Sequence, residues 1–300
     1  MSPERRPWVA VLVSFLFGPG IGQLYNGKLR KAAAFVIGLP IALALCARLM
    51  MALQTQPWNV VLPMCGFATF LILSWVDAGL DARTLRQVPR PWYGRWHTCM
   101  AAGLLNVFVI MPAAVVMMRT TWAQAFKLPA GSMEPTLLIG DRLLVDRTAY
   151  GIHVGSTVIG ARAPARGDLI AFRYPKNPAM TYLKRVIGLP GERIEVRGKT
   201  VYVDGCRLDE PYAHYLSNSD GDLDGMSPWG PEKVPAGHVF VLGDSRDRSL
   251  DSRFFGWVPI ADLLGEAKVV YFSWESTARE YSRDSTKGRV RWERIGLALR

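Results

Sequence analysis

Apolar residues are distributed unevenly along the chain of 300 residues, and their pattern changes near residue 118. Three stretches before that point are long and apolar enough to cross a bilayer as helices: residues 32–51, 58–76 and 99–118. A fourth stretch, residues 8–24, is shorter and is interrupted by Gly18-Pro19-Gly20. This pattern predicts a multi-pass α-helical membrane region over residues 1–118, with three to four apolar helical segments.

From residue 127 onward the pattern changes to short apolar runs separated by Gly, Pro and Asp. The runs alternate or group β-branched and aromatic residues over about four to six positions, which is typical of strands. They are residues 141–146, 167–172, 193–197, 200–204, 238–242 and 267–272. Residues 119–300 are therefore predicted to form a mainly antiparallel β domain, folded as a sandwich or a distorted barrel.

Basic residues predict the orientation of the membrane region, because loops rich in Lys and Arg stay in the cytoplasm. Two loops carry them: Lys28, Arg30 and Lys31 before segment 32–51, and Arg83, Arg86, Arg90 and Arg95 before segment 99–118. The loop at 54–59 carries no charge and is expected outside, so the β domain is expected on the outer face. Arg5 and Arg6 also favour the cytoplasm. Both flanks of segment 8–24 thus favour the same side, which predicts a re-entrant segment rather than a true span.

The formal net charge of +11 fits either nucleic acid or anionic lipid as a partner. Because membrane segments are present, lipid headgroups and positive-inside loops explain the charge better, and no nucleic-acid partner is expected. Of the four cysteines, only Cys206 lies in the β domain, so no disulfide can form within it. The sequence has no C-x-x-C pair, and we predict neither a metal site nor a cofactor.

Ser132 is the first candidate for chemistry. It lies in the run Pro129-Ala-Gly-Ser-Met-Glu-Pro135, shortly after the last apolar segment. A serine hydroxyl needs a base to become a nucleophile, and this half of the chain holds three histidines, His153, His214 and His238. None of them lies in a motif that fixes a triad, no G-x-S-x-G elbow surrounds Ser132, and Pro135 occupies the lysine position of an S-x-x-K motif. We interpret the three histidines as structural.

Lys184 is the alternative base, in the run Tyr182-Leu183-Lys184-Arg185. A free lysine has a pKa of about 10.4, so almost none is neutral at pH 7. Burial among apolar neighbours disfavours the charged form, and lowering the pKa by two units takes roughly 2.7 kcal/mol. The alternative is a lysine that extends to solvent at a strand end, which is the commonest fate of lysines.

A third cluster, residues 243–256, follows a strand-like run and is dense in hydroxyls and opposed charges. Such density is consistent with a networked loop, and a hydroxyl from it could orient a neutral amine through a hydrogen bond. A solvated, charge-rich turn is the alternative interpretation.

The three clusters, in this order and behind membrane segments, closely resemble the bacterial signal peptidase I family. The matching stretches are GSMEPTLLIGDRLLV, GDLIAFRYP, YLKRVIGLPGE and GDSRDRSLDSRFFGWVP, which span most of residues 127–259. The resemblance implies a signal-peptidase-like β catalytic domain with a variable β insertion at about 193–237. It implies a membrane-bound serine endopeptidase that removes N-terminal signal peptides after small residues, in an A-x-A pattern. The implied location is the bacterial cytoplasmic (inner) membrane, with the catalytic domain on the periplasmic face. The implied partners are secretory preproteins and the lipid bilayer, near the secretion translocon.

The resemblance also assigns roles to residues. Ser132 would be the nucleophile and Lys184 the general base, Ser249 would orient the lysine, and Asp251 and Arg253 would form a structural salt bridge. Substrate-binding positions would be Phe126, Leu128, Pro129, Met133, Leu137, Tyr182 and Leu183. Many enterobacterial-type members have a serine that helps to bind the oxyanion where this chain has Ala130. The backbone N–H of Ser132 would then supply most of that stabilisation, and losing one such donor can cost on the order of 3 kcal/mol.

Two alternatives stay open from the sequence. One is a specialised Ser/Lys processing peptidase with a single dedicated substrate, for example in conjugative transfer. The other is a catalytically inactive, membrane-anchored module that binds exported chains. The presence of both Ser132 and Lys184 argues against the inactive module, because an inactive relative would be free to lose either residue.

Overall fold

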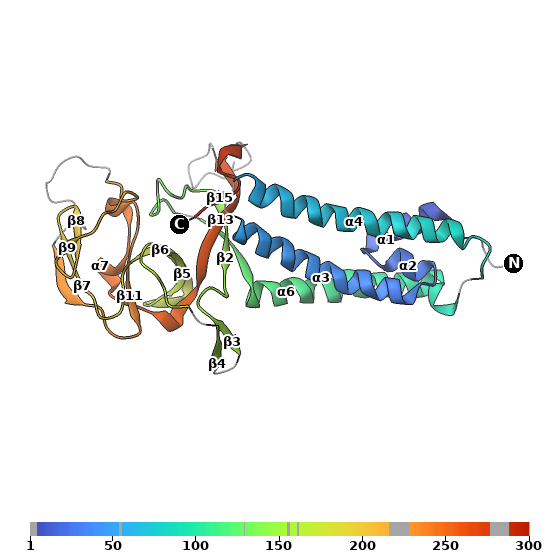
Figure 1. The fold of residues 1–300 in the computed structure, drawn as a ribbon, viewed down its shortest axis with the longest axis horizontal. Coiled ribbons are helices and arrows are strands. Elements are labelled where there is room, and N and C mark those ends of the chain that lie inside the picture. Colours follow the sequence, from blue (N-terminus) through green and yellow to red (C-terminus); the bar gives the residue numbers. More distant parts are fainter. Residues whose placement is uncertain are drawn as a thin grey trace. The chain divides into compact units, whose positions relative to one another are not determined.

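A computed structural model of the chain shows two compact units (Figure 1). The first comprises Met1–Gln54 and Trp58–Thr120, and the second Thr55–Pro57 and Thr121–Arg300. The structure describes residues 5–53, 56–89, 91–128, 130–154, 157–160, 162–215, 228–276 and 288–299.

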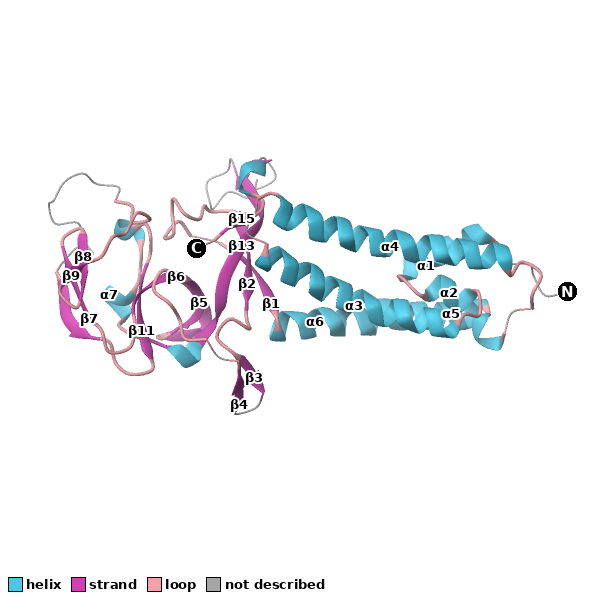
Figure 2. Ribbon diagram, viewed as in Figure 1, coloured by secondary structure: helices cyan, strands magenta, loops and turns pink. Residues whose placement is uncertain are grey.

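The first unit is helical (Figure 2). Its helices are α1 (Pro7–Phe17), α2 (Ile21–Tyr25), α3 (Leu29–Ala52), α4 (Trp58–Thr84), α5 (Trp96–Leu105) and α6 (Met111–Thr121), with a short 3₁₀ helix at Trp92–Gly94. A π-helical turn, Asn106–Ile110, joins α5 to α6. Within the described chain, three helical stretches are long and apolar enough to cross a membrane: Leu29–Ala52, Trp58–Thr84 and Trp96–Met117.

The segment predicted to be re-entrant reverses its direction between α1 and α2. The two helices pack closely because Gly22 has no side chain: a Cβ there would lie 2.3 Å from the carbonyl oxygen of Ala10. The residues that flank the hairpin lie at one end of the unit. Arg5 donates to the carbonyl oxygen of Pro89 (3.2 Å), and the Tyr93 hydroxyl donates to that of Gly27 (3.2 Å). The chain therefore reverses its direction within the helical unit, and re-entry into a membrane stays a prediction.

Helix α4 extends eight residues beyond the apolar stretch that predicted it, to Thr84. Its last turns carry Asp77 and Asp81, which both accept from the Lys31 ammonium of α3, at 2.7 and 2.9 Å. The side-chain amide of Gln23 donates to the Ser74 carbonyl oxygen (2.8 Å). Hydropathy marks the apolar part of a helix, but these polar contacts extend the helix past it.

The second unit is built on a nine-stranded antiparallel sheet, with the order β1-β2-β13-β5-β6-β11-β12 and with β14 and β15 both paired to β13. Its strands are β1 (Ala123–Lys127), β2 (Asp141–Asp146), β5 (Leu169–Tyr174), β6 (Asn177–Gly188), β11 (His238–Leu242), β12 (Val258–Pro259), β13 (Leu263–Ser276), β14 (Gly288–Val290) and β15 (Leu297–Ala298). This sheet agrees with the prediction of an antiparallel β domain.

Smaller elements complete this unit. A four-stranded sheet has the order β10-β7-β8-β9, and a two-stranded one joins β3 to β4. Their strands are β3 (Ile152–Val154), β4 (Thr157–Ile159), β7 (Arg193–Arg197), β8 (Thr200–Val203), β9 (Cys206–Arg207) and β10 (Trp229–Lys233). The short helices are α7 (Ser252–Phe255) and 3₁₀ turns at Arg246–Arg248, Ile260–Asp262 and Trp292–Arg294. The four-stranded sheet lies within the range expected for a β insertion, and Trp229 packs on Phe240 of β11 with ring centroids 4.4 Å apart.

Candidate active site

Strand β6 carries Lys184 next to the point at which β11 begins to pair with it. In the register of β6 with β5, Lys184 lies opposite Ile170, and β11 pairs with β6 from Arg185 onward. Only 4% of Lys184 is exposed. Its Nζ is 2.5 Å from Oγ of Ser132, 52 residues earlier in the chain, and donates to it as an ammonium. Both residues predicted to carry the chemistry therefore meet.

The loop after β1 presents Ser132. Two apolar side chains, Met133 and Leu137, are fully buried in the core below it. The backbone N–H of Leu137 donates to the Met133 carbonyl oxygen (2.9 Å), which closes a tight turn. The alternation of buried and exposed positions in this loop leaves Ser132 half-buried at its surface, beside the lysine.

Asp141, at the start of β2, anchors the other end of this loop. Its fully buried carboxylate accepts from the backbone N–H of Leu138 (2.9 Å) and from the Ser273 hydroxyl (2.6 Å). Arg294, near the end of the chain, donates to the same carboxylate (2.6 Å) and to the carbonyl oxygen of Thr136 (2.9 Å). A residue 153 positions away thus fixes the loop that carries the nucleophile.

Burial changes the chemistry of the Lys184 amine. It lowers the pKa of Lys184 to about 8, because the ammonium loses its hydration. The carboxylates of Asp251 and Asp244 raise this pKa and limit the shift, and the Arg253 guanidinium lowers it further. Near neutral pH a useful fraction of Lys184 is therefore an uncharged amine, which can accept a proton from the hydroxyl that it contacts.

The charge-rich cluster at 243–256 is a loop stabilised by an ion pair and a hydrogen bond between its own residues. Asp251 pairs with Arg253 at 2.8 Å and accepts from the backbone N–H of Gly243 at 3.1 Å. A Cβ on Gly243 would lie 2.2 Å from Oγ of Ser249 and 2.5 Å from the carbonyl oxygen of Ser132. This glycine therefore lets the loop pack directly against the nucleophile.

Ser249 lies beside Gly243, which adjoins the carbonyl oxygen of Ser132, and Asp251 and Arg253 form the ion pair that the resemblance implies. The hydroxyl of Ser249 is buried and has no hydrogen-bond partner in the part of the chain that the structure describes. Its role in orienting Lys184 stays a prediction.

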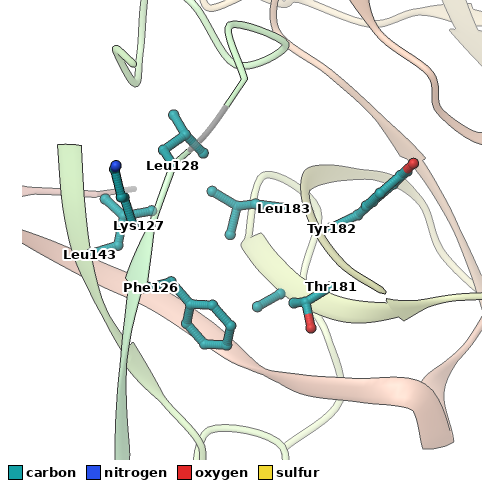
Figure 3. A pocket seen from close by; sticks show the side chains of 8 residues that line it. Phe126, Lys127, Leu128, Leu143, Thr181, Tyr182 and Leu183 are labelled. Carbon is teal, nitrogen blue, oxygen red and sulfur yellow. The ribbon is translucent and has the colours of Figure 1, made fainter. Parts of the chain in front are cut away.

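A small pocket lies between β1 and β6 (Figure 3). Its free volume is about 50 Å³, and its lining residues are Phe126, Lys127, Leu128, Leu143, Ala171, Thr181, Tyr182 and Leu183. Figure 3 shows Leu183 pointing from β6 toward Leu128 and Phe126. The lining is mostly apolar, and a space of this size suits a small side chain.

Four of the seven predicted substrate-binding residues line this pocket: Phe126, Leu128, Tyr182 and Leu183. Met133 and Leu137 belong instead to the core cluster beside Leu128, and Pro129 lies outside the described residues. Ala130, the position of the missing oxyanion serine, is exposed.

Three buried ion pairs around the dyad were not predicted from the sequence. They are Arg185–Asp244 (2.7 Å), Arg246–Glu210 (2.5 Å) and Arg294–Asp141 (2.6 Å). Each joins distant parts of the chain, so no local pattern identifies the partners. The only signal was the density of charges in the cluster at 243–256 and next to Lys184.

A family model and several known proteins resemble this chain. A family model described as signal peptidase, peptidase S26, matches residues 101–274. Signal peptidase I of Pseudomonas fluorescens is 35% identical over 194 residues, covering 53% of this chain and 68% of the relative. Signal peptidase I of Leptolyngbya laminosa is 40% identical over 161 residues, covering 51% of this chain and 71% of the relative.

A solved signal peptidase I from Enterococcus faecalis V583 has 38% sequence identity and covers 35% of this chain and 97% of that chain, with a TM-score of 0.30. The family model covers more than half of the 300 residues and includes both Ser132 and Lys184. The chain therefore belongs to the signal peptidase family, peptidase S26.

Proposed function

We propose that this protein is a membrane-bound serine endopeptidase that removes N-terminal signal peptides from exported preproteins, with Ser132 as nucleophile and Lys184 as general base. The observation that carries the proposal is the contact of 2.5 Å between Lys184 Nζ and Ser132 Oγ, on a lysine that burial makes partly neutral. The names of the relatives, signal peptidase I, support the choice of substrate.

The reaction proceeds in two halves. Neutral Lys184 takes the hydroxyl proton while Oγ of Ser132 attacks the scissile carbonyl carbon, which gives a tetrahedral oxyanion and a lysine ammonium. The ammonium protonates the departing amine, the C–N bond breaks, and an acyl-enzyme remains. Lys184 then takes a proton from water, the hydroxide attacks the ester, and the proton returns to Oγ as the signal peptide leaves with a carboxylate. No other reactant is needed.

The substrate lies as an extended strand between β1 and β6 in this proposal. Among the described strands, β1 pairs with β2 alone, and residues 177–184 of β6 pair with β5 alone. Each strand therefore has a backbone edge that can pair with a peptide, as in other β-augmentation sites. The pocket between Phe126 and Leu183 then accepts a small side chain, which supports cleavage after small residues.

We place the catalytic unit on the outer face of a bacterial cytoplasmic membrane, near the translocon from which preproteins emerge. Three apolar helices support a multi-pass anchor. The basic residues at 28–31 and 83–95 support a cytoplasmic location for those loops. The Lys31 ammonium, paired with Asp77 and Asp81, lies at the basic end of α3.

The test uses the full-length protein in liposomes and a model preprotein with an A-x-A cleavage site. We expect Ser132→Ala and Lys184→Met to abolish cleavage while both variants remain folded. Lys268→Met is the matched control, because the Lys268 side chain is 32% exposed and pairs with Glu266 rather than with Ser132, and it should cleave like the wild type. The wild-type rate should rise with pH through about 8 as Lys184 loses its proton. Cleavage by Ser132→Ala or Lys184→Met would refute the assignment.

A further inference from the structure

A short segment between β9 and β10 of the four-stranded sheet lies along the loop that contacts the nucleophile. We call residues 210–215 the bracing segment. The backbone N–H of its His214 donates to the Asp244 carbonyl oxygen (2.7 Å), and that of Arg246 donates back to the carbonyl oxygen of His214 (3.0 Å). The two segments thus pair as one parallel β-bridge, between His214 and Ser245.

A buried ion pair strengthens this contact. The Arg246 guanidinium donates to both carboxylate oxygens of Glu210, at 2.5 and 3.2 Å, and its Nε donates to the Gly243 carbonyl oxygen at 3.0 Å. The two side chains are 2% and 6% exposed. A bidentate pair that is excluded from water fixes position and orientation together.

The bracing segment also reaches the strand that carries the base. The ring of Tyr212 lies 4.1 Å from the guanidinium carbon of Arg185, which follows Lys184 in β6. Arg185 in turn donates to both carboxylate oxygens of Asp244, at 2.9 and 2.7 Å. One segment therefore contacts the neighbour of the base and the loop behind the nucleophile.

The loop passes this restraint on to Ser132. The backbone N–H of Ser245 donates to the Ser132 carbonyl oxygen at 3.2 Å. Gly243, whose carbonyl oxygen Arg246 binds, lies against the same carbonyl and against Ser249. Any movement of Arg246 would therefore move groups that contact the nucleophile directly.

From these contacts we propose that Glu210 is a positioning residue: through Arg246 it sets the position of Ser132 relative to Lys184. The proposal rests on the proposed function, because it assumes the Ser132–Lys184 dyad. Glu210 contacts neither member of the dyad in the structure. Its effect is on the geometry of the reacting groups, and misplacement by about 1 Å can cost about 100-fold in rate.

The experiment compares Glu210→Gln with Glu195→Gln. Glu195 belongs to the same four-stranded sheet but pairs with Arg197, whose side chain is 63% exposed. We expect Glu210→Gln to lower kcat between about 10-fold and about 100-fold, with KM within about twofold because the pocket between β1 and β6 is untouched. Its pH–rate midpoint should rise, because a loosened loop lets water reach Lys184. Glu195→Gln should change none of these.

A second, charge-conserving variant tests the same interaction in case Glu210→Gln fails to fold. Arg246→Lys keeps the positive charge and loses the bidentate geometry, so it should show the same loss of kcat at unchanged KM. The double variant Glu210→Gln/Arg246→Lys should lose no more kcat than either single variant. Each of the three variants disrupts the same Glu210–Arg246 ion pair, so the effects should not add.

A lower Tm for these variants with kcat and pH midpoint equal to the wild type would overturn the proposal, because the pair would then serve only the fold. An equal loss in Glu195→Gln would also overturn it. Failure of the dyad itself is recognised separately, as cleavage by Ser132→Ala.

Discussion

At the residue scale, the site depends on an amine placed where its charge is disfavoured. Lys184 is 4% exposed, and burial is the largest cause of its lowered pKa. The two nearby carboxylates, Asp251 and Asp244, oppose this lowering and keep it moderate. A lysine with an unchanged pKa would be fully protonated at neutral pH, and one without nearby carboxylates would be a weaker base. The arrangement therefore favours a pKa close to the working pH.

This placement has a cost in stability that can be measured. The pKa of Lys184 is about 8 when folded and about 10.4 when unfolded, so the unfolded chain binds more protons between those values. The stability of the wild type should then rise as pH increases from about 8 to about 10.4. Below pH 8, burial of the ammonium costs about 3 kcal/mol, because a tenfold change in proton affinity corresponds to about 1.36 kcal/mol.

We therefore expect Lys184→Met to be inactive and more stable than the wild type at pH 7, by up to about 3 kcal/mol. Methionine has a similar length and carries no charge. Thermal unfolding of both proteins in one detergent, at pH 7 and at pH 10, checks this. The gain should shrink at pH 10, where the wild-type amine is neutral. A variant less stable than the wild type at pH 7 would contradict the expected cost of burial.

At the scale of elements, the sequence predicted the helices and strands whose residues form a recognisable local pattern. Alternating β-branched runs predicted β2, β5, β7, β8, β11 and part of β13, and hydropathy predicted the three long helices. The pairing of Ser132 with Lys184 was implied by the resemblance to the signal peptidase I family, and the two side chains are in contact in the structure. Local pattern could not predict that β13 runs for 14 residues between β2 and β5, because that position depends on long-range pairing.

Ion-pair partners were beyond prediction for the same reason. Asp141 and Arg294 lie 153 residues apart, and neither stands out from its neighbours in the sequence. The pocket was predicted in part. Phe126 and Leu183 line it, whereas Met133 and Leu137 are buried in the core below, and alternation in an irregular loop does not distinguish a pocket wall from a core.

The anchor of the nucleophile loop gives a prediction at this scale. Arg294→Gln should destabilise the second unit by about 3 kcal/mol, because it leaves the fully buried carboxylate of Asp141 without its cation. Arg289→Gln is the control: Arg289 pairs with Glu275 but is 82% exposed, so its loss should have little effect on stability. Urea titration of both variants checks the difference. Equal effects would show that the Asp141–Arg294 pair does not anchor the loop.

At the scale of the whole molecule, the apolar helices and the candidate active site lie in different units. The helical unit carries the long apolar helices, and the second unit holds Ser132, Lys184 and the pocket. The net charge of +11 fits a chain that contacts anionic lipid.

Cysteine labelling tests the orientation. Cys206 is exposed in the second unit, whereas Cys46, Cys65 and Cys99 lie in helices of the first. We expect a membrane-impermeant maleimide to label Cys206 on intact spheroplasts, because the proposed orientation has the catalytic unit facing outward. The Cys206→Ser variant, which removes that thiol, should not be labelled. Labelling of the wild type only after lysis would place the unit in the cytoplasm.

The hairpin of α1 and α2 has a consequence for biogenesis. Because it returns to the end at which it begins, it would add no crossing to the proposed membrane anchor, which then has the three long apolar helices of the described residues. In the proposed orientation, three crossings keep Arg5 and Arg6 on the cytoplasmic side and place everything after α6 outside. The insertion machinery then never has to export the leading residues, and the first long helix to emerge, α3, can act as an uncleaved start-transfer signal.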